Sequence, residues 1–238
     1  MQETSMRTAI AYRFRPFAAL IMASALLVGC AGSTPTIDAG DDAAMTYDGL
    51  YPVKGGTADE TFARPGADIS RYSKIMLQSV GIEYRPGGES GRLTYGRAGA
   101  DHYEISDAQK QRLRAVVSEA FLAELGQSKH FTLVNEPGPD VLLVRGALLD
   151  VVSYVPPEPL GRGEIYLRTV GEATLVLELR DSVSEAIIAR AVDRRAAEDT
   201  FGMSASNRVN NAAEVRRLAR SWATLLRKRL DTFAELGE

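Results

Sequence analysis

The residue types that most often carry out catalysis or bind metals are sparse in this sequence. Only two of the 238 residues are histidines, His102 and His130. Either could act as a general base, because the ordinary pKa of an imidazole is about 6.5. Their positions, one in a polar loop and one between a helix end and a strand, are more typical of exposed histidines without a catalytic role. No HExxH motif occurs and the two histidines do not have ligand spacing, so we expect no metal site.

Motifs for a nucleophile or a phosphate-binding loop are incomplete. Residues 88–91 (GESG) lack the spacing of the G-x-S-x-G elbow that exposes a catalytic serine. Residues 161–163 (GRG) lack the third glycine and the following helix of a dinucleotide-binding loop. We therefore expect no bound cofactor.

Carboxylates are the remaining candidates for chemistry. Asp150 interrupts an apolar stretch, and Asp181 and Asp193 flank a predicted hairpin. Two carboxylates about 5 to 9 Å apart could hydrolyse a glycosidic bond. Such residues more often begin turns or pair with nearby arginines. We expect that the protein is not an enzyme, and a hydrolase with dispersed carboxylates is the third of three functional hypotheses.

The single cysteine, Cys30, ends an apolar stretch close to the N-terminus. Three arginines within residues 7–15 precede the twelve apolar or small residues 17–28 (FAALIMASALLV). That stretch is too short to span a bilayer, which needs about 20 residues. A basic, then apolar, then small-residue order is typical of a secretory signal. We expect residues 1–29 to be a signal peptide that starts at Met1 or Met6.

Residues 27–30 (LVGC) resemble the lipoprotein box of bacterial signal peptides. The resemblance implies cleavage between Gly29 and Cys30 and fatty acylation of Cys30. Labelled palmitate would then be incorporated into the modified protein. Two acyl chains anchor a protein stably, because each buried CH₂ contributes about 0.8 kcal/mol. Ala31, rather than an aspartate, follows the cysteine, which favours the outer membrane. We expect a lipid-anchored protein on its periplasmic face.

The mature chain is expected to form a tether and one domain. Residues 30–46 are small, polar and acidic, which indicates a lipidated flexible tether. Residues 47–238 are expected to form a single periplasmic domain, in which residues 47–72 are punctuated by glycine and proline and predict irregular structure. Apolar or alternating patterns predict strands at residues 74–84, 131–134, 141–155, 166–179 and 186–196.

Two amphipathic helices are also predicted. In residues 106–126, Ser106 and Gln109 fit a capping box and Gly126 is expected to follow the last turn. The second helix is expected over about residues 212–236, with Asn211 as its cap. The order of elements predicts an α+β fold: a two-layer sandwich in which two long helices cover a mainly antiparallel sheet of about five strands.

The charge of the chain argues against nucleic acid as a partner. The net charge of −3 creates no general attraction for phosphate backbones. Six cations on the predicted C-terminal helix could still contact phosphate, but in an exported protein we favour a solvated face or ion pairs with acidic residues of the sheet. These cations are Arg216, Arg217, Arg220, Arg227, Lys228 and Arg229.

Residues 154–160 (YVPPEPL) predict a stiff apolar loop, the first candidate for a contact with an envelope protein. Proline-rich segments lose little conformational freedom on binding. A loop stiffened only for stability is the alternative interpretation. The residues expected to contact a partner are Tyr154, Val155, Pro156, Pro157 and Leu160.

Val170 to Arg195 (VGEATLVLELRDSVSEAIIARAVDRR) resembles bacterial lipoproteins of the domain of unknown function 3313 family. Residues 47–53 (YDGLYPV), 64–77 (RPGADISRYSKIML) and 222–231 (WATLLRKRLD) strengthen the resemblance, which covers about residues 47–233. The chain departs from the pattern at Glu185, where such hairpin turns often carry glycine. The resemblance implies a secreted, lipid-anchored envelope protein without an assigned activity.

Two non-catalytic functions are favoured over the hydrolase. The preferred one is a periplasmic interaction or assembly module at the outer membrane, with an envelope protein as a possible partner. The alternative is a carrier for a small apolar ligand held between sheet and helices. A cavity of several hundred Å³ between Trp222 and the sheet would favour the carrier, whereas an exposed apolar patch near residues 154–160 would favour the module.

Overall fold

The computed structural model describes residues 35–40, 42–86, 102–156, 164–198 and 202–236. All of them belong to one compact unit, Thr34–Glu238. Its elements in chain order are β1 (Thr36–Ile37), β2 (Tyr51–Lys54), β3 (Glu60–Ala63), β4 (Lys74–Tyr84), α1 (Asp107–Leu125), β5 (Thr132–Val134), β6 (Val141–Ser153), β7 (Tyr166–Leu167), β8 (Thr169–Asp181), β9 (Ile187–Glu198), β10 (Ser204–Ala205) and α2 (Arg208–Leu236).

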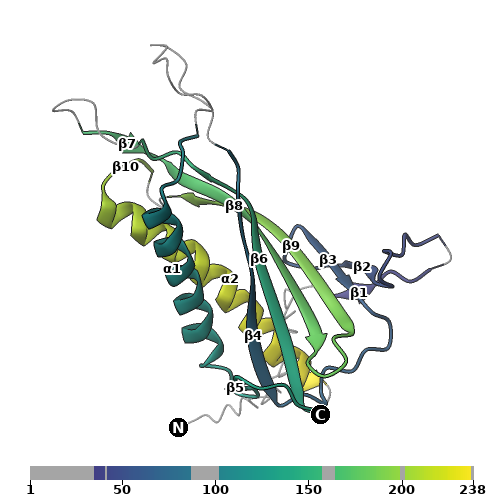
Figure 1. Cartoon of the computed structure of the whole chain (residues 1–238). Helices are drawn as coiled ribbons and strands as arrows, with labels where there is room; N and C mark the ends of the chain where they lie inside the picture. Colours follow the sequence, from purple (N-terminus) through teal and green to yellow (C-terminus); the bar gives the residue numbers. More distant parts are fainter. Residues whose placement is uncertain (1–34, 41, 87–101, 157–163, 199–201, 237–238) are drawn as a thin grey trace, which may run out of the picture. The chain divides into compact units, whose positions relative to one another are not determined.

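Eight of the strands form one mixed sheet in the order β1-β2-β3-β9-β8-β6-β4-β5 (Figure 1). The pairs are antiparallel except where β4 lies parallel to β5 and β6, and α1 provides the long connection that parallel neighbours require. β7 and β10 form a separate two-stranded sheet. The α+β prediction with two long helices is therefore confirmed, whereas the expected five-stranded sheet is too small.

The three strands of the large sheet that the sequence analysis missed lie in the segment that the sequence indicated to be irregular or a tether. β1 pairs with β2, β2 with β3, and β3 with the long strand β9. Each is only two to four residues long, so none shows the alternation of polar and apolar residues on which strand prediction depends. Their pairing with a distant strand, rather than their own composition, makes them part of the sheet.

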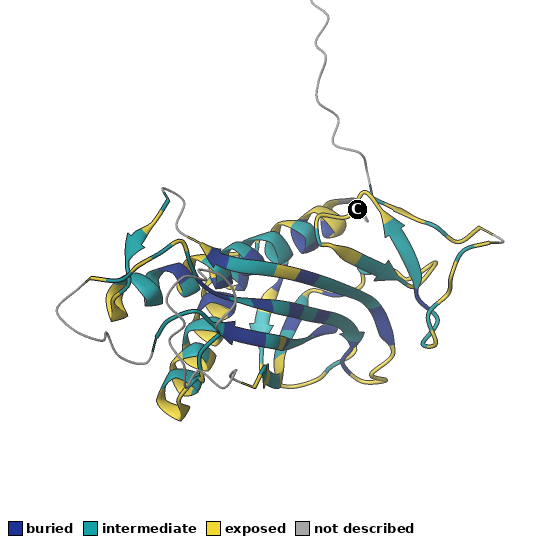
Figure 2. Ribbon diagram, turned by 90° about the horizontal axis from the view of Figure 1, so that it is seen from above, coloured by how far each residue is buried: buried dark blue, intermediate teal, exposed yellow. Residues whose placement is uncertain are grey.

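The long strands follow the predicted patterns closely. β4 has the predicted bounds, and β8 alternates as expected: Ala173, Leu175 and Leu177 are buried, whereas Thr174 and Glu178 on the other face are only half-buried. Figure 2 shows buried residues recurring along these strands. The alternation places one face of the sheet against the helices and leaves charged residues on the other.

The capping box of α1 is confirmed. The Ser106 hydroxyl accepts from the Gln109 backbone N–H, and the Gln109 side chain accepts from the Ser106 backbone N–H. Gly126 follows the helix with φ of −63°, so the chain ends this helix without the left-handed residue that a glycine there often supplies.

The start predicted for α2 is wrong by four residues. The helix begins at Arg208, and the side chain of Asn207 accepts hydrogen bonds from the backbone N–H groups of Val209 and Asn210 at 3.0 and 2.9 Å. Asn207 is therefore the cap, and Asn211 lies within the first turns. The β7–β10 pairing ends at Ala205, two residues before this cap.

Candidate functional site

Trp222, the one tryptophan of the chain, lies on α2 and is 3% exposed. It lines two cavities between the helices and the sheet. We call them the small cavity, of about 430 Å³, and the large cavity, of about 780 Å³. A cavity beside this tryptophan is the observation that the sequence analysis named as favouring a carrier over an interaction module.

The small cavity lies between the C-terminal half of α2 and strands β3, β8 and β9. Leu175 and Leu177 of β8 face Leu226 of α2 across it. Alanines at positions 189 and 191 of β9 supply little volume on the sheet side, which is one reason why the space is not filled.

The large cavity lies between both helices and the ends of β6 and β8. Val116 of α1 and Val215 of α2 form part of its helix side, and Leu148 and Val152 of β6 part of its sheet side. Small residues from three elements surround it and leave the space open. They are Gly171, Ala173, Ala197, Ala212 and Ala219.

A buried carboxylate holds the indole between the two cavities. Asp193 of β9, which is 6% exposed, accepts a hydrogen bond from Trp222 Nε1 at 2.6 Å. The same carboxylate oxygen lies 2.6 Å from Arg195 Nε, and the other accepts from the Asp59 backbone N–H at 3.3 Å. Arg195 offsets the negative charge of Asp193, which burial would otherwise penalise. The hydrogen bond from Trp222 Nε1 to Asp193 sets the orientation of the indole.

The proline-rich segment forms part of the wall of the large cavity. Tyr154, Val155 and Pro156 are half-buried, and the latter two line the cavity. The Tyr154 backbone N–H donates to Val170 O at 2.9 Å, and burial, together with the nearby Glu172, raises the pKa of the Tyr154 phenol. Pro157 and Leu160, the other two predicted partner contacts, lie outside the described residues, as do Gly29, Cys30 and the motifs at 88–91 and 161–163.

The three candidate catalytic aspartates are each bound by arginine. Asp193 pairs with Arg195 as described, and Asp150 accepts from Arg85 Nε at 2.6 Å and lies 3.2 Å from Arg194. The hydrogen bonds from Arg85 hold the pKa of Asp150 below its usual value.

Asp181 closes the turn between β8 and β9. Its carboxylate accepts from the Ser184 backbone N–H and hydroxyl and from Tyr72 Oη, and Arg71 lies 2.6 Å away. These bonds, with the Ser184 backbone N–H as the largest cause, lower the Asp181 pKa to about 2. A carboxylate held ionised in this way stabilises the turn and is a poor proton donor at neutral pH.

The two histidines have structural partners. His102 Nε2 lies 2.7 Å from Pro86 O, which fixes it as the donor, and His130 Nε2 lies 3.5 Å from a Glu235 carboxylate oxygen. Within the described parts of the chain, no group of three or more histidine, cysteine or acidic side chains could hold a metal ion.

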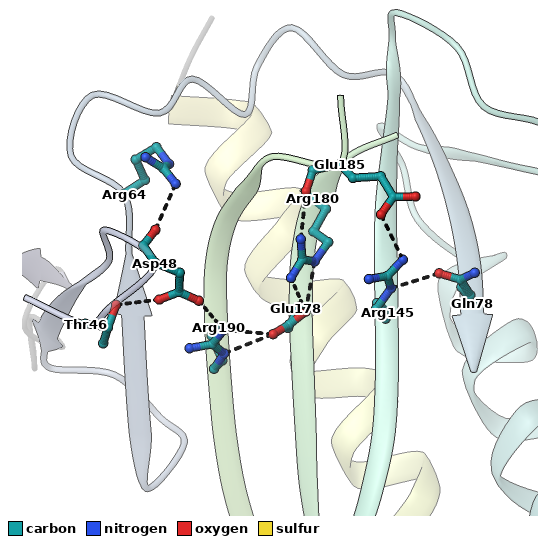
Figure 3. A network of polar contacts seen from close by, with 9 residues as sticks. All are labelled: Thr46, Asp48, Arg64, Gln78, Arg145, Glu178, Arg180, Glu185 and Arg190. Atoms are coloured by element: carbon teal, nitrogen blue, oxygen red, sulfur yellow. Dashed lines mark hydrogen bonds and ion pairs between the residues drawn. The ribbon is translucent and has the colours of Figure 1, made fainter. Parts of the chain in front are cut away.

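A ladder of charged residues covers the sheet face opposite the helices (Figure 3). Arg190 of β9 bridges Glu178 of β8 and Asp48, and Glu178 also binds Arg180 at 2.8 Å. These arginines lower the pKa of Glu178 against the opposing effect of burial. Because Asp48 precedes β2, the ladder connects the short N-terminal strands to the central sheet, and its charges satisfy one another.

The basic face of α2 is partly solvated, as one of the two predicted alternatives had it, since Arg216, Arg220 and Lys228 are exposed, and it is partly paired. Arg217 pairs with Glu214 of its own helix, and Arg227 lies 3.7 Å from Glu124 of α1 and 3.4 Å from Asp231. Within the described residues these acidic partners lie on the two helices, which pack side by side (Figure 1). These pairs join the two helices.

The fold and the cavities define a class: an α+β domain with two helices on a mixed eight-stranded sheet and apolar cavities beside a single tryptophan. A family model described as "Protein of unknown function (DUF3313)" matches residues 40–158, half of the chain. The protein belongs to this family, as the sequence resemblance indicated. The quoted residues 47–53 and 64–77 lie inside the matched range, whereas the hairpin and the end of α2 lie beyond it.

Several solved structures are similar to this chain at low sequence identity. A PelC dodecamer from Paraburkholderia phytofirmans is 12% identical, with 69% of this chain and 96% of that chain covered and a TM-score of 0.34. Protein XCC0632 from Xanthomonas campestris is 10% identical, with 73% and 91% covered and a TM-score of 0.39. CT253 from Chlamydia trachomatis is 9% identical, with 68% and 99% covered and a TM-score of 0.33. No curated protein matches the sequence.

Among the helices that the structure describes, none is long and apolar enough to cross a membrane.

Proposed function

We propose that this protein is a lipid-anchored envelope protein that binds a small apolar molecule between its helices and its sheet. The observation that carries the proposal is the pair of cavities, of about 430 and 780 Å³, on either side of Trp222. Ligand sites are typically mostly apolar spaces of about 300 to 1,000 Å³ with a few polar groups.

The packing around the cavities supports a binding role over a structural one. Protein interiors are normally close-packed, whereas both spaces are partly open to solvent, so their apolar lining remains in contact with water and forgoes the free energy of burial. Here alanines face the space at positions such as Ala173, Ala212 and Ala219, where larger apolar residues would close it. A ligand would supply the contacts that these small residues leave unmade.

The anchor is proposed to be the acylated Cys30, which would hold the domain on the periplasmic face of the outer membrane. The order of basic, apolar and small residues before Cys30 supports this assignment. Replacing the cysteine (Cys30→Ser) should abolish labelling by radioactive palmitate and release the protein from the membrane fraction. The anchor is contradicted if the parent protein is not labelled by palmitate, or if the Cys30→Ser variant still sediments with membranes. Neither outcome affects the cavity proposal.

The cavity proposal can be tested with N-phenyl-1-naphthylamine, an uncharged apolar probe that fluoresces in dry environments. Binding should raise the probe emission and quench the emission of Trp222, which is the only tryptophan and lines both cavities. The double variant Val116→Phe/Val215→Phe places larger side chains into the large cavity from both helices and should weaken probe binding about tenfold.

The matched control is Val209→Phe, the same change on α2 at a position that is 75% exposed and outside the cavity lining. It should bind the probe like the parent. If the parent protein does not bind the probe, neither cavity is a binding site for it. If Val209→Phe and the double variant bind the probe alike, the large cavity is not the binding site.

An interaction module remains the second candidate, supported by exposed apolar side chains around the β7–β10 pair. Tyr166 is 51% exposed, Met203 62% and Val209 75%, and Tyr166 pairs with Ala205 across the small sheet. Exposed apolar groups that gather in one place often mark protein contacts. A photo-reactive residue at Val209, with one at Val155 for the predicted loop, should crosslink an envelope protein in living cells. If mass spectrometry finds no envelope protein crosslinked at either position, this candidate fails.

A further inference from the structure

Three arginines surround the large cavity on its helix side. Arg208 and Arg216 line it from α2, and Arg112 lines it from α1. On α2 the positions 208, 212 and 216 recur every four residues, so they share one helix face, and Ala212 of that face also lines the cavity. On α1, Arg112 is likewise four residues before the cavity-lining Val116. The two helices therefore present cations beside an apolar interior.

These arginines are exposed and make no ion pair within the described parts of the chain. Two acidic residues also line the cavity, but both have partners: Glu172 binds Arg194, and Glu164 accepts from Tyr166 Oη at 2.8 Å. The positive end of the α2 dipole lies at Arg208, in the first turn of the helix. The local charge beside the cavity is therefore positive although the chain as a whole is acidic.

We infer that the large cavity binds a single-chain anionic amphiphile, such as a long-chain fatty acid. Its apolar chain lies among the valines, leucines and alanines of the cavity, and its carboxylate contacts Arg112, Arg208 and Arg216. A volume of about 780 Å³ lies within the range for one small ligand. Guanidinium groups recognise carboxylates through paired hydrogen bonds, which an uncharged alcohol of the same length cannot form. This inference rests on the proposed binding function and specifies its ligand.

The test compares dodecanoate with 1-dodecanol, because both have the same chain and only one carries a charge at pH 8. Each compound displaces bound N-phenyl-1-naphthylamine from the parent protein at concentrations below its solubility or micelle limit. We expect dodecanoate to act at about tenfold lower concentration than dodecanol. In the double variant Arg112→Gln/Arg216→Gln, the dodecanoate concentration that displaces the probe should rise to nearly that of dodecanol. The dodecanol concentration should stay unchanged.

The matched control is Arg114→Gln/Arg220→Gln. It removes the same two charges from the same two helices, at positions that do not line the large cavity. It should keep the tenfold preference, which separates a local contact from the effect of net charge. The inference is overturned if the parent protein shows no preference for dodecanoate, or if both double variants lose the preference equally. In this assay the proposed function itself fails if the probe does not bind or if neither compound displaces it.

Discussion

Removal of the Asp193 carboxylate should strongly destabilise the fold, because that group holds both Trp222 and Arg195. In Asp193→Ala the indole N–H, on a side chain only 3% exposed, loses its acceptor. An unsatisfied buried donor costs about 1 to 3 kcal/mol. The side chain of Arg195 is 35% exposed, so water can replace part of its lost ion pair. Loss of this ion pair therefore adds only about 1 kcal/mol to the destabilisation. We expect a total loss of about 2 to 4 kcal/mol, a large share of an ordinary domain's stability of about 5 to 15 kcal/mol.

The control for this prediction is Asp193→Asn. The amide oxygen can still accept from Trp222 Nε1, while the charge that pairs with Arg195 is gone. We expect this variant to lose about 1 kcal/mol, clearly less than the alanine variant.

Both variants can be measured by urea unfolding, followed by the emission of Trp222 and by far-ultraviolet circular dichroism. The second signal is needed because each substitution also changes the surroundings of the indole. An alanine variant within about 0.5 kcal/mol of the parent, or an asparagine variant as unstable as the alanine one, would refute the role assigned to this hydrogen bond.

Three further predictions concern the turn and the strands. Glu185 has φ of +55°, so Glu185→Gly should raise the free energy of unfolding in urea by about 0.5 to 1 kcal/mol, whereas Glu185→Ala, which keeps the Cβ, should bring no gain. The Asp181 pKa is about 2 instead of 3.8, so its ionised form contributes up to about 2 kcal/mol that is fully present above about pH 4 and lost as the pH falls through about 2. The stability advantage of the parent over Asp181→Asn should therefore shrink in urea titrations from pH 4.5 to 2, and an advantage constant with pH would contradict this. A Cβ on Gly171 would lie 2.4 Å from Val152 O, so Gly171→Ala should lower the melting temperature and cost about 2 kcal/mol. Gly146→Ala, whose Cβ would lie 3.4 Å from a Leu177 methyl group, is the control and should change it little.

The elements that the sequence predicts well are those specified by neighbouring residues. The capping box at Ser106 and Gln109 defines the start of α1, because both hydrogen bonds join residues three apart. The alternation of apolar and polar side chains specifies β8, and a similar pattern specifies β9. The resemblance to the DUF3313 family depends on similarly local patterns and agrees with the family match over residues 40–158.

The predictions fail where contacts outside the local sequence decide the structure. The sequence favoured Asn211 as the cap of α2, whereas the cap is Asn207, which follows the β7–β10 pair. The short strands β1 to β3 become part of the sheet through β9, more than 120 residues later in the chain. Such contacts depend on the closing of long loops, for which local patterns carry no signal.

By itself the sequence determined the family, the α+β class and most boundaries of the long strands and helices, and it predicts an anchor at Cys30. The tertiary structure alone decided that Asp193 binds Trp222 from a strand 29 residues away and that Arg112 of α1 lies on the same cavity as Arg208 and Arg216 of α2. The cavities themselves also belong to the tertiary structure. A single alanine in a strand or helix pattern is ordinary, and only the packing of three elements shows that several of them face one another across an empty space.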